Sequence, residues 1–569
     1  MTERKSRRRL LAAPVVQPPP AQVGRELPAD CPVVALGMMR GEVSGAVYLS
    51  GAGLIVRLTG QAHGNGNLEA LFAPHVSYVW KHWPRLSKAG TVDGFRSELL
   101  RGDLLHEAGK RGVWTDLDRV RGAGAWRDGA RRLVLHLGDR LVYEGQVQRW
   151  GLIGEHVYPA APSRPGPADA AEDGSAAAEV LGLLRTFHWR YPDVAPLLLL
   201  GWIAAAMLGG ALDWRPHAWV TGDRGSGKST LLDLVRRILG PNGSVATANT
   251  TAAGVRQSVG DAALPVLLDE LEPQADGADV VGQLVELLRQ ASSGGVGLRG
   301  GTDHQATAFQ IKSSMLAASI LVPPLRTQDR TRIALLEMIP RPGSGGGLGL
   351  SDARAQTLGQ RVLRGLVDGW EKLPERLDTW REQLKAHLGV DNRGADQYGT
   401  LLACADVALG VCDGDAEDMQ EITERIGALI AEARVEDVPD WRRCADHLMT
   451  FAGEFWRGGD KMTIGRMVAQ AGGRFGLDGA DQAQRALATY GLRVVTEDGA
   501  VWVAVANQHS GLSGVYRGTV WGQRSVTGGG WRQTLLRTPG SRARTVPLRF
   551  EGHASRVVLV PLEAMLGDA

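Results

Sequence analysis

The sequence predicts a multidomain α/β protein built around a parallel β-sheet. Three observations support this fold class: a length of 569 residues, an alternation of apolar strands and amphipathic helices over residues 177–340, and a glycine-rich loop, GDRGSGKS, inside that stretch. A chain of this length exceeds what one hydrophobic core normally supports. Alternating strands and helices are typical of a parallel sheet, so we interpret the remaining segments as additional domains.

Three segments precede the core. Residues 1–30 are expected to form a disordered basic tail, because an arginine run is followed by a proline cluster. Residues 31–158 contain short alternating apolar runs, such as LIVRL and RRLVLHL, between glycine-rich turns. This pattern predicts an N-terminal domain of mixed α/β or mostly β structure. The sequence PAAPSRPGPADAAEDGSA at 159–176 indicates a linker.

Two segments follow the core, which we place at 177–345. The stretch 346–460 begins with a glycine-rich loop and continues with apolar residues at helical spacing, which predicts a helical region. In residues 461–569 two helical stretches, TIGRMVAQA and ADQAQRALATY, precede the hairpin LRVVTEDGAVWVAVA. This order predicts a winged-helix-like C-terminal domain.

The composition is typical of a soluble globular protein, with a net charge of only +2. Residues 195–212, APLLLLGWIAAAMLGGAL, are apolar enough to raise a membrane-spanning alternative. Because this segment ends just before the strand that leads into the glycine-rich loop, we expect a buried core helix and no membrane partner. The cysteines lack zinc-ligand spacing, so we expect reduced thiols and a cytoplasmic location. They are Cys31, Cys404, Cys412 and Cys444.

The glycine-rich loop is the strongest functional signal. HAWVTGDRGSGKST at 217–230 fits the pattern G-x-x-x-x-G-K-[ST] between an apolar strand and an amphipathic helix. Backbone N–H groups of such a loop surround a phosphate, and the helix N-terminus adds a favourable dipole. Lys228 would reach the β- and γ-phosphates of ATP, and Ser229 would offer its hydroxyl to Mg²⁺. The predicted nucleotide-binding residues are Gly222, Asp223, Arg224, Gly225, Ser226, Gly227, Lys228, Ser229 and Thr230.

A pair of carboxylates supplies the predicted chemistry. The strand LPVLLDELE ends in Asp269 and Glu270, and ligands of parallel sheets bind at the carboxyl ends of the strands. Asp269 would hold Mg²⁺ together with Ser229, and Glu270 would orient and deprotonate the attacking water as general base. A carboxylate pair after an apolar run is a weak signal alone, but the phosphate-binding loop strengthens it.

Two further elements are predicted to complete the site. The strand IKSSMLAASI carries Ser319 near its end, where its hydroxyl would contact the γ-phosphate or the attacking water; a serine that merely ends a strand is the alternative. LRTQDRTRIALLEM then places Arg326, Arg330 and Arg332 before another apolar strand. An arginine there can reach the nucleotide of a neighbouring subunit in a ring. We favour Arg332 for this role and interpret the other two as surface residues.

Between the carboxylates and Ser319, VGLRGGTDHQATAFQI predicts a β-hairpin with Arg299 and His304 near its tip. A hairpin that points into a ring channel with a cation at its tip would grip a nucleic-acid backbone. An ordinary edge hairpin is the alternative.

The C-terminal region has a local excess of positive charge. From Val515 to Arg556 there are eight arginines and one acid, Glu551, with Trp521 and Trp531 among them. Arginine interleaved with tryptophan suits phosphate contact and base stacking, so we expect DNA binding here. Core tryptophans with solubilising surface arginines are the alternative.

A primase-like pattern in the N-terminal domain is much weaker. Asp116, Asp118, His136 and Asp139 have a passing similarity to the D-x-D, His, Asp order of archaeal-type primases. Spaced aspartates are common on solvated turns, and the segment is short for that fold. We therefore assign no primase activity.

The order of phosphate-binding loop, Asp-Glu strand, hairpin, serine-ended strand and arginine segment resembles AAA+ ATPases of the helicase superfamily 3 type. VLLDE, LLRQASSGG, AASI and QDRTRIALLEM are similar to the ATPase region of phage- and prophage-encoded primase-helicase proteins. The similarity covers about residues 195–340 and departs from superfamily 3 at Ser319, where asparagine is usual. It implies a hexameric, ATP-driven translocase on single-stranded or forked DNA, working with host or phage replication proteins.

Two other functions remain open at this stage. The chain could be an AAA+ helicase loader or a DNA-binding regulatory ATPase that lacks processive unwinding. It could also be a membrane-associated ATPase anchored by residues 195–212.

Overall fold

The structure is a computed structural model, and it shows two compact units, Met1–Ile430 and Ala431–Ala569. The predicted basic tail lies almost entirely outside the described residues. These are 26–41, 45–117, 119–248, 250–271, 280–300, 306–323, 325–340, 349–412, 416–435, 439–454, 461–474, 476, 478–522, 524–525 and 528–567.

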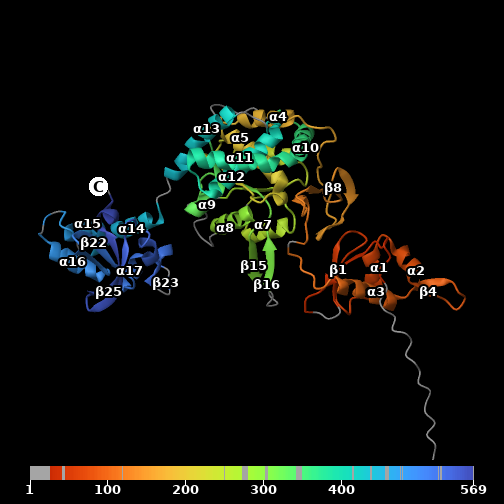
Figure 1. The fold of residues 1–569 in the computed structure, drawn as a ribbon, viewed down its shortest axis with the longest axis horizontal. Helices are drawn as coiled ribbons and strands as arrows, with labels where there is room; N and C mark the ends of the chain where they lie inside the picture. The colour runs from red at the N-terminus through yellow and green to blue at the C-terminus, as the bar shows by residue number, and fades with distance from the viewer. Residues whose placement is uncertain are drawn as a thin grey trace, which may run out of the picture. The chain divides into compact units, whose positions relative to one another are not determined.

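The first unit begins with a small α/β module that has its own core of side chains such as Tyr48, Phe72 and Leu100. Three antiparallel strands form its sheet, and a two-stranded ribbon extends beside its helices (Figure 1). The strands are β1 (Val34–Met38), β2 (Ala46–Leu49), β3 (Ile55–Leu58), β4 (Pro84–Leu86) and β5 (Val92–Phe95). The helices are α1 (Asn65–Phe72), α2 (Val76–His82) and α3 (Ser97–Lys110).

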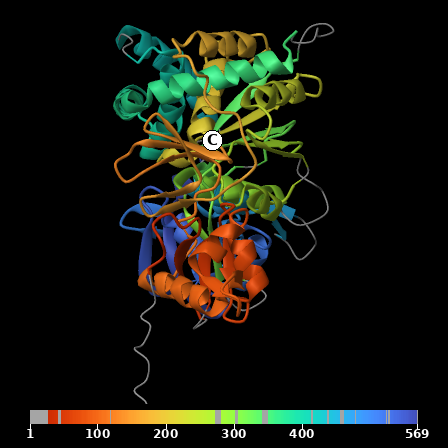
Figure 2. The same ribbon diagram turned by 90° about the vertical axis from the view of Figure 1, so that its right-hand side faces the viewer.

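A second antiparallel sheet belongs to the central core instead. Its first strand lies against the turn Gly209–Ala211, and Figure 2 shows this sheet, in orange, beside the central core. Leu135 and Leu137 join the same hydrophobic cluster as α5 (Ala195–Leu208). The predicted N-terminal domain therefore does not have a single core. The strands of this sheet are β6 (Gly124–Arg127), β7 (Leu133–His136), β8 (Arg140–Tyr143) and β9 (Gln146–Arg149). The strands β10 (Gly151–Ile153) and β11 (His156–Tyr158) pair as a separate two-stranded sheet. From residue 159 to the start of α4 (Ser175–Arg185) the chain forms neither helix nor strand.

The centre of the first unit is the predicted parallel sheet. Its strands follow the order β13-β14-β17-β12-β18, and all neighbours are parallel. Both faces are buried, which explains the continuous apolar runs in the sequence. The strands are β12 (His217–Gly222), β13 (Val245–Ala248), β14 (Val266–Asp269), β17 (Met315–Ser319) and β18 (Ile333–Met338).

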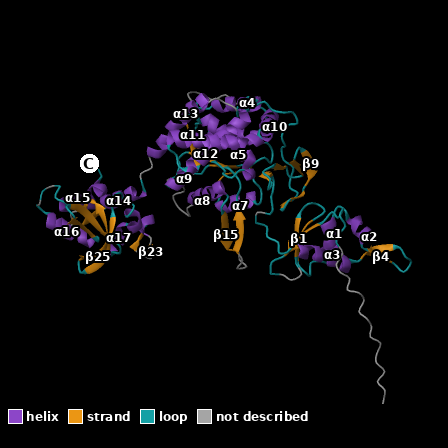
Figure 3. Cartoon of the chain, in the orientation of Figure 1, coloured by secondary structure: helices purple, strands orange, loops and turns teal. Residues whose placement is uncertain are grey.

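Helices cover both faces of this sheet. Trp219 and Leu268 pack toward α7 (Ala252–Val259) and α8 (Val280–Ser293), whereas Ala218 and Val220 pack into the cluster of α5. The alternation follows from the two-residue period of a strand. On the side of α5 lie α6 (Lys228–Leu239), α10 (Asp352–Asp368), α11 (Leu373–Leu388), α12 (Asn392–Leu409) and α13 (Ala416–Val435) (Figure 3).

The apolar segment 195–212 forms a core helix, as predicted. α12 packs so closely on α5 that a Cβ on Gly201 would lie 2.0 Å from the Leu401 carbonyl oxygen. Among the described residues, no helix is both long and apolar enough to cross a bilayer. The helical region after residue 346 is thus partly a cover for the sheet and shares its core.

The predicted hairpin is present. β15 (Val296–Gly300) pairs antiparallel with β16 (Ala306–Gln310), and Arg299 lies opposite Thr307. Figure 1 shows the hairpin extending away from the core beside α7 and α8. The short helix α9 (Thr327–Arg330) lies between β17 and β18 in the chain.

The second unit begins about thirty residues earlier than the predicted boundary at 460–461. The reason is that Cys444 and Leu448 of α14 (Asp440–Thr450) belong to its core. It contains the predicted order of two helices and a hairpin, α15 (Ile464–Ala471), α16 (Ala480–Thr489), β21 (Leu492–Glu497) and β22 (Ala500–Ala506).

A second hairpin extends the sheet of this unit to the order β21-β22-β26-β25, so the winged-helix assignment stays a prediction. The remaining elements are β19 (Ala452–Glu454), β20 (Lys461–Thr463), α17 (Ser510–Val515), β23 (Arg524–Ser525), β24 (Gly528–Gly529), α18 (Gly530–Leu535), β25 (Arg542–Phe550), β26 (His553–Pro561) and α19 (Leu562–Leu566).

Candidate nucleotide site

The glycine-rich loop connects β12 to α6 through backbone conformations that require glycine. Gly225 and Gly227 have φ values of +82° and +97°, in the left-handed region that other residues rarely adopt. Gly222 is also constrained by space, because a Cβ there would lie 2.3 Å from the Met338 carbonyl oxygen. These constraints hold the loop tightly at the start of α6, where helix N–H groups face outward.

Lys228 is directed back over the loop. Its ammonium donates hydrogen bonds to the carbonyl oxygens of Gly222, at 2.6 Å, and Asp223, at 3.1 Å. The charge is therefore held at the mouth of the loop, where phosphate oxygens would compete for the same donors. Ser229 and Thr230 are exposed beside it. The Ser226 hydroxyl, in contrast, is buried and has no hydrogen-bond partner among the described residues.

The strand that carries the loop is anchored by His217. This side chain is fully buried, and desolvation lowers its pKa to about 3, so the imidazole is neutral. Nε2 donates to the Leu288 carbonyl oxygen at 2.7 Å, and Nδ1 accepts from the Met315 backbone N–H at 3.0 Å. One neutral imidazole thereby ties β12 to both α8 and β17.

Asp269 and Glu270 lie at the same edge of the sheet as the loop. β17 separates β14 from β12, which sets the carboxylates roughly 10 Å from the loop strand, two inter-strand spacings. The Glu270 backbone N–H donates to Asp269 Oδ1 at 2.9 Å. Glu270 is exposed and has φ +58°, a left-handed conformation that is unfavourable for glutamate and is often found at functional positions.

The Ser319 side chain is buried in the core. Its hydroxyl accepts a hydrogen bond from the Trp219 indole N–H at 2.8 Å and donates to the Leu321 carbonyl oxygen at 2.7 Å. The side chain is only 2% exposed, although the residue pairs with Thr221 beside the loop. A contact between this hydroxyl and a phosphate stays a prediction.

The choice of Arg332 as the intersubunit arginine stays a prediction, although the structure places its side chain mainly in the interior. Its side chain is only 9% exposed, lies over the Trp214 ring, and donates to the Gln328 carbonyl oxygen. Burial also lowers the pKa of its guanidinium. A buried arginine cannot reach a neighbouring subunit without unpacking. Arg326 is exposed and is the better-placed member of the segment.

The structure describes one of the two hairpin residues that are predicted to contact nucleic acid. Arg299 lies in β15, one residue before the strand ends. His304 lies outside the described residues. Phe309 at the base of the hairpin packs against the guanidinium of Arg256 on α7, 4.8 Å from ring centroid to Cζ, which joins the hairpin to the sheet-covering helices.

Sequence reasoning missed a segment that lies behind the loop. Residues 186–191, TFHWRY, pair with the end of β18. The Ile339 N–H donates to the His188 carbonyl oxygen at 3.0 Å, and Trp189 and Met338 form an isolated antiparallel β-bridge. Phe187 and Met338 flank the space beside Gly227. The cluster of aromatic residues in TFHWRY is the sequence feature that could have indicated this segment. The pairing itself could not be predicted, because it joins positions about 150 residues apart.

Three of the four primase-like residues are described by the structure, and each has its own local contacts. Asp116 bonds to Arg57 and to the Trp114 indole, and Asp139 pairs with Arg140. His136 is buried in β7, where desolvation lowers the pKa of its imidazole. Asp118 lies outside the described residues.

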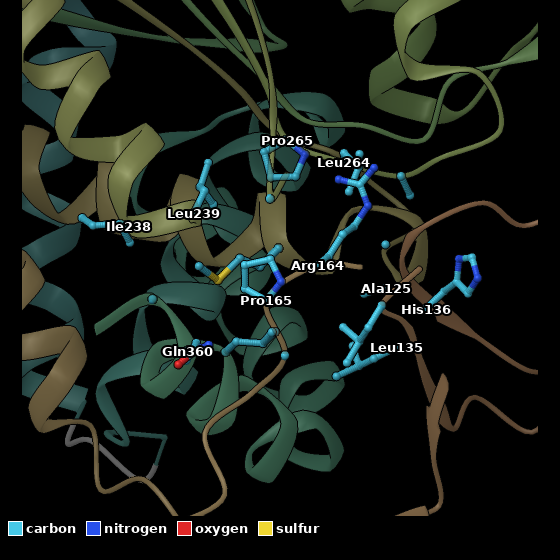
Figure 4. A pocket seen from close by; sticks show the side chains of 18 residues that line it. Ala125, Leu135, His136, Arg164, Pro165, Ile238, Leu239, Leu264, Pro265 and Gln360 are labelled. Carbon is cyan, nitrogen blue, oxygen red and sulfur yellow. The ribbon is translucent and has the colours of Figure 1, made fainter. Parts of the chain in front are cut away.

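His136 also borders a mainly apolar cavity of about 70 Å³ at the far end of α6 from the loop (Figure 4). Arg164, Pro165, Leu239 and Pro265 line other sides of it.

In the second unit, one of the two tryptophans of segment 515–556 is buried and two of its eight arginines form ion pairs. Trp531 is 2% exposed and its indole donates to the Ala506 carbonyl oxygen. Arg542 and Arg544 both pair with Glu497. Trp521 is only half-buried. DNA binding by this region stays a prediction that cannot rest on Trp531.

No protein-family description and no curated protein matches the chain. Among solved structures it is similar to an active helicase, Cch of SCCmec type IV, with a TM-score of 0.45, 11% identity, and 94% of each chain covered. It is also similar to the C-terminal region of NrS-1 in an apo form, with a TM-score of 0.31 and 12% identity over 93% of this chain and 96% of that one. Both TM-scores are low, so we base the functional proposal on this chain's own residues.

Proposed function

We propose that the chain is a Mg²⁺-dependent ATPase that drives translocation along DNA. The observation that carries the ATPase assignment is one shared sheet edge. A glycine-constrained loop with Lys228 and a carboxylate pair, Asp269 and Glu270, lie there with one strand between them. This spacing suits a triphosphate that extends from the loop toward the carboxylates.

The donor set fits a hard divalent cation. Mg²⁺ in phosphate sites is typically held by one or two protein oxygens, with phosphates and water completing its shell. The Ser229 hydroxyl and an Asp269 carboxylate oxygen would supply these protein ligands. The cation would neutralise charge on the β- and γ-phosphate oxygens.

Each residue then has a defined task. Lys228 would leave its two carbonyl partners and donate to the β- and γ-phosphates. The Glu270 carboxylate would accept the proton of the water that attacks the γ-phosphorus, which yields ADP and inorganic phosphate. Its exposure and left-handed backbone present the carboxylate away from the packed face of the sheet.

The hairpin connects this chemistry to DNA. β14 and β17 are neighbours in the sheet, and the chain between them forms α8 and the hairpin β15–β16. A small shift at the carboxylate edge can therefore move the hairpin, in which Arg299 would contact a phosphate backbone. We further propose a ring of subunits in which Arg326 approaches the nucleotide of the next subunit.

The decisive experiment measures ATP hydrolysis with and without single-stranded DNA, alongside sedimentation analysis with nucleotide present. We expect an oligomer whose hydrolysis is stimulated by DNA, and a Lys228→Ala variant that is folded and inactive. Unchanged hydrolysis in Lys228→Ala would refute the site. A monomer indifferent to DNA would refute the translocase and favour a loader or regulatory ATPase.

A mixing experiment tests the intersubunit arginine. Arg326→Ala and Glu270→Ala subunits are each expected to be inactive alone, and mixed rings should regain part of the activity because intact sites form at some interfaces. Arg330→Ala provides the comparison within the same segment. An absence of rescue would remove Arg326 from this role.

A further inference from the structure

The N-terminal module exposes three large apolar side chains on adjoining elements. Trp80 on α2 is 43% exposed, and Leu86 and Val92 on the ribbon are 61% and 49% exposed. Leu86 and Val92 are a cross-strand pair, and α2 packs against both ribbon strands. Isolated exposed apolar residues are ordinary, but a group on neighbouring elements marks an interaction surface.

The exposure of Trp80 is fixed by the fold of the helix. Val79 is fully buried, and Trp83 is buried with its indole N–H donating to Asp103 at 2.8 Å. These two anchors on either side of Trp80 orient α2, so its indole cannot turn inward without unpacking both. The surface is therefore built into the module.

Exposed cations lie on or next to the same elements as these apolar side chains. Lys81, Lys88 and Arg96 are exposed on α2, on the ribbon loop and just after β5. Asp93, the acid of the ribbon, accepts from Arg85 at 3.0 Å, and Glu98 pairs with Arg96. The carboxylates are thus engaged by the two arginines, and the two lysines add positive charge to α2 and to the ribbon loop. We call Trp80, Lys81, Leu86, Lys88 and Val92 the α2–ribbon surface.

We propose that the α2–ribbon surface binds single-stranded DNA, with the Trp80 indole stacked on an unpaired base and the two lysines on flanking phosphates. An exposed indole with exposed lysines on the same helix and on the adjoining ribbon suits a single strand, because bases supply flat faces and the backbone supplies charge. Duplex DNA fits poorly, since its bases are already stacked on one another. The inference rests on the proposed function only for the identity of the strand as DNA.

The test is fluorescence anisotropy of a labelled oligo-dT titrated with the full-length protein without nucleotide. Trp80→Ala is expected to weaken binding about tenfold, the loss of one stacked base. Lys81→Glu with Lys88→Glu should lower the slope of log affinity against log salt by about 1.4, the contribution of two phosphates on a single strand. Basal ATP hydrolysis should stay unchanged in both variants.

Matched controls are exposed residues elsewhere in the same unit. Val147→Ala removes an apolar side chain from β9, and Lys385→Glu reverses a charge on α11. Neither should alter binding. Wild-type affinity in Trp80→Ala would overturn the proposal, as would a change of oligomeric state without loss of DNA affinity, which would identify a protein-protein surface.

The outcomes separate this surface from the ATPase assignment. Binding of oligo-dT through Trp80 by a protein that hydrolyses no ATP would sustain the surface and refute the proposed function. Hydrolysis by a protein whose Trp80→Ala variant binds like the wild type would do the reverse. Oligo-U and a blunt duplex form the remaining arms: tighter binding of either than of oligo-dT would overturn the preference for single-stranded DNA.

Discussion

Two regions have sequence patterns that predict ligand binding, and their side chains are placed differently in the structure. In the loop at 222–230, glycines with positive φ place Lys228 at an open edge of the sheet. In the segment 515–556, Trp531 fills the core and Arg542 and Arg544 pair with Glu497. The glycine pattern of the loop specifies backbone geometry, which only a few residue types can adopt. The arginine and tryptophan content of 515–556 is only a composition, and the same residues can serve equally well in a core or in ion pairs within the domain.

The largest expected effect tests the loop side of this comparison. Glu270→Gln removes the general base and should reduce ATP hydrolysis by about 10²–10⁴-fold while ATP binding persists. Single-turnover hydrolysis and nucleotide titration would measure the two quantities. Glu382→Gln, an exposed carboxylate on α11, is the control. Hydrolysis within a few-fold of wild type would mean that Glu270 is only the end of a strand.

Trp531→Ala tests the other side. Loss of a fully packed indole should destabilise the C-terminal unit by about 3–5 kcal/mol, seen as an early transition in urea. Trp521→Ala should cost less, because this side chain is only half-buried. If Trp531→Ala instead left stability intact and weakened DNA binding, Trp531 would act in DNA binding and not in the core.

The arginine segment supplies an intermediate case. Arg332→Ala should lower stability by about 1–3 kcal/mol, because it leaves the Trp214 ring and the Gln328 carbonyl oxygen without their partner. Arg326→Ala should change stability by less than about 0.5 kcal/mol, as is usual for exposed sites. Thermal unfolding of both variants compares them directly. Equal losses would remove the distinction between the two arginines.

The smallest expected effect concerns the C-terminal arginines that remain exposed. If Arg556 contacts a phosphate, Arg556→Ala should lower the salt slope of single-stranded DNA binding by about 0.7. Arg542→Ala should leave that slope unchanged, because its guanidinium already pairs with Glu497 and Asp498. A wild-type slope in both variants would mean that neither arginine contacts a phosphate.

The parallel sheet and the positions of Lys228, Asp269 and Glu270 could be predicted because short-range patterns specify them. Apolar strands and loop glycines are specified by neighbouring residues, and the order of the elements can be read directly along the sequence. The burial of Ser319 and Arg332 could not be predicted, because it depends on packing with Trp219 and Trp214 from distant parts of the chain. The pairing of residues 188–189 with β18 was missed for the same reason.

The backbone of Glu270 has one more consequence. Asparagine and glycine accept φ +58° more readily than glutamate, so Glu270→Asn should raise the melting temperature while it abolishes hydrolysis. A selection for thermostable variants would therefore be drawn to position 270 and would recover inactive proteins, whereas a selection for activity would retain a residue that the fold itself disfavours.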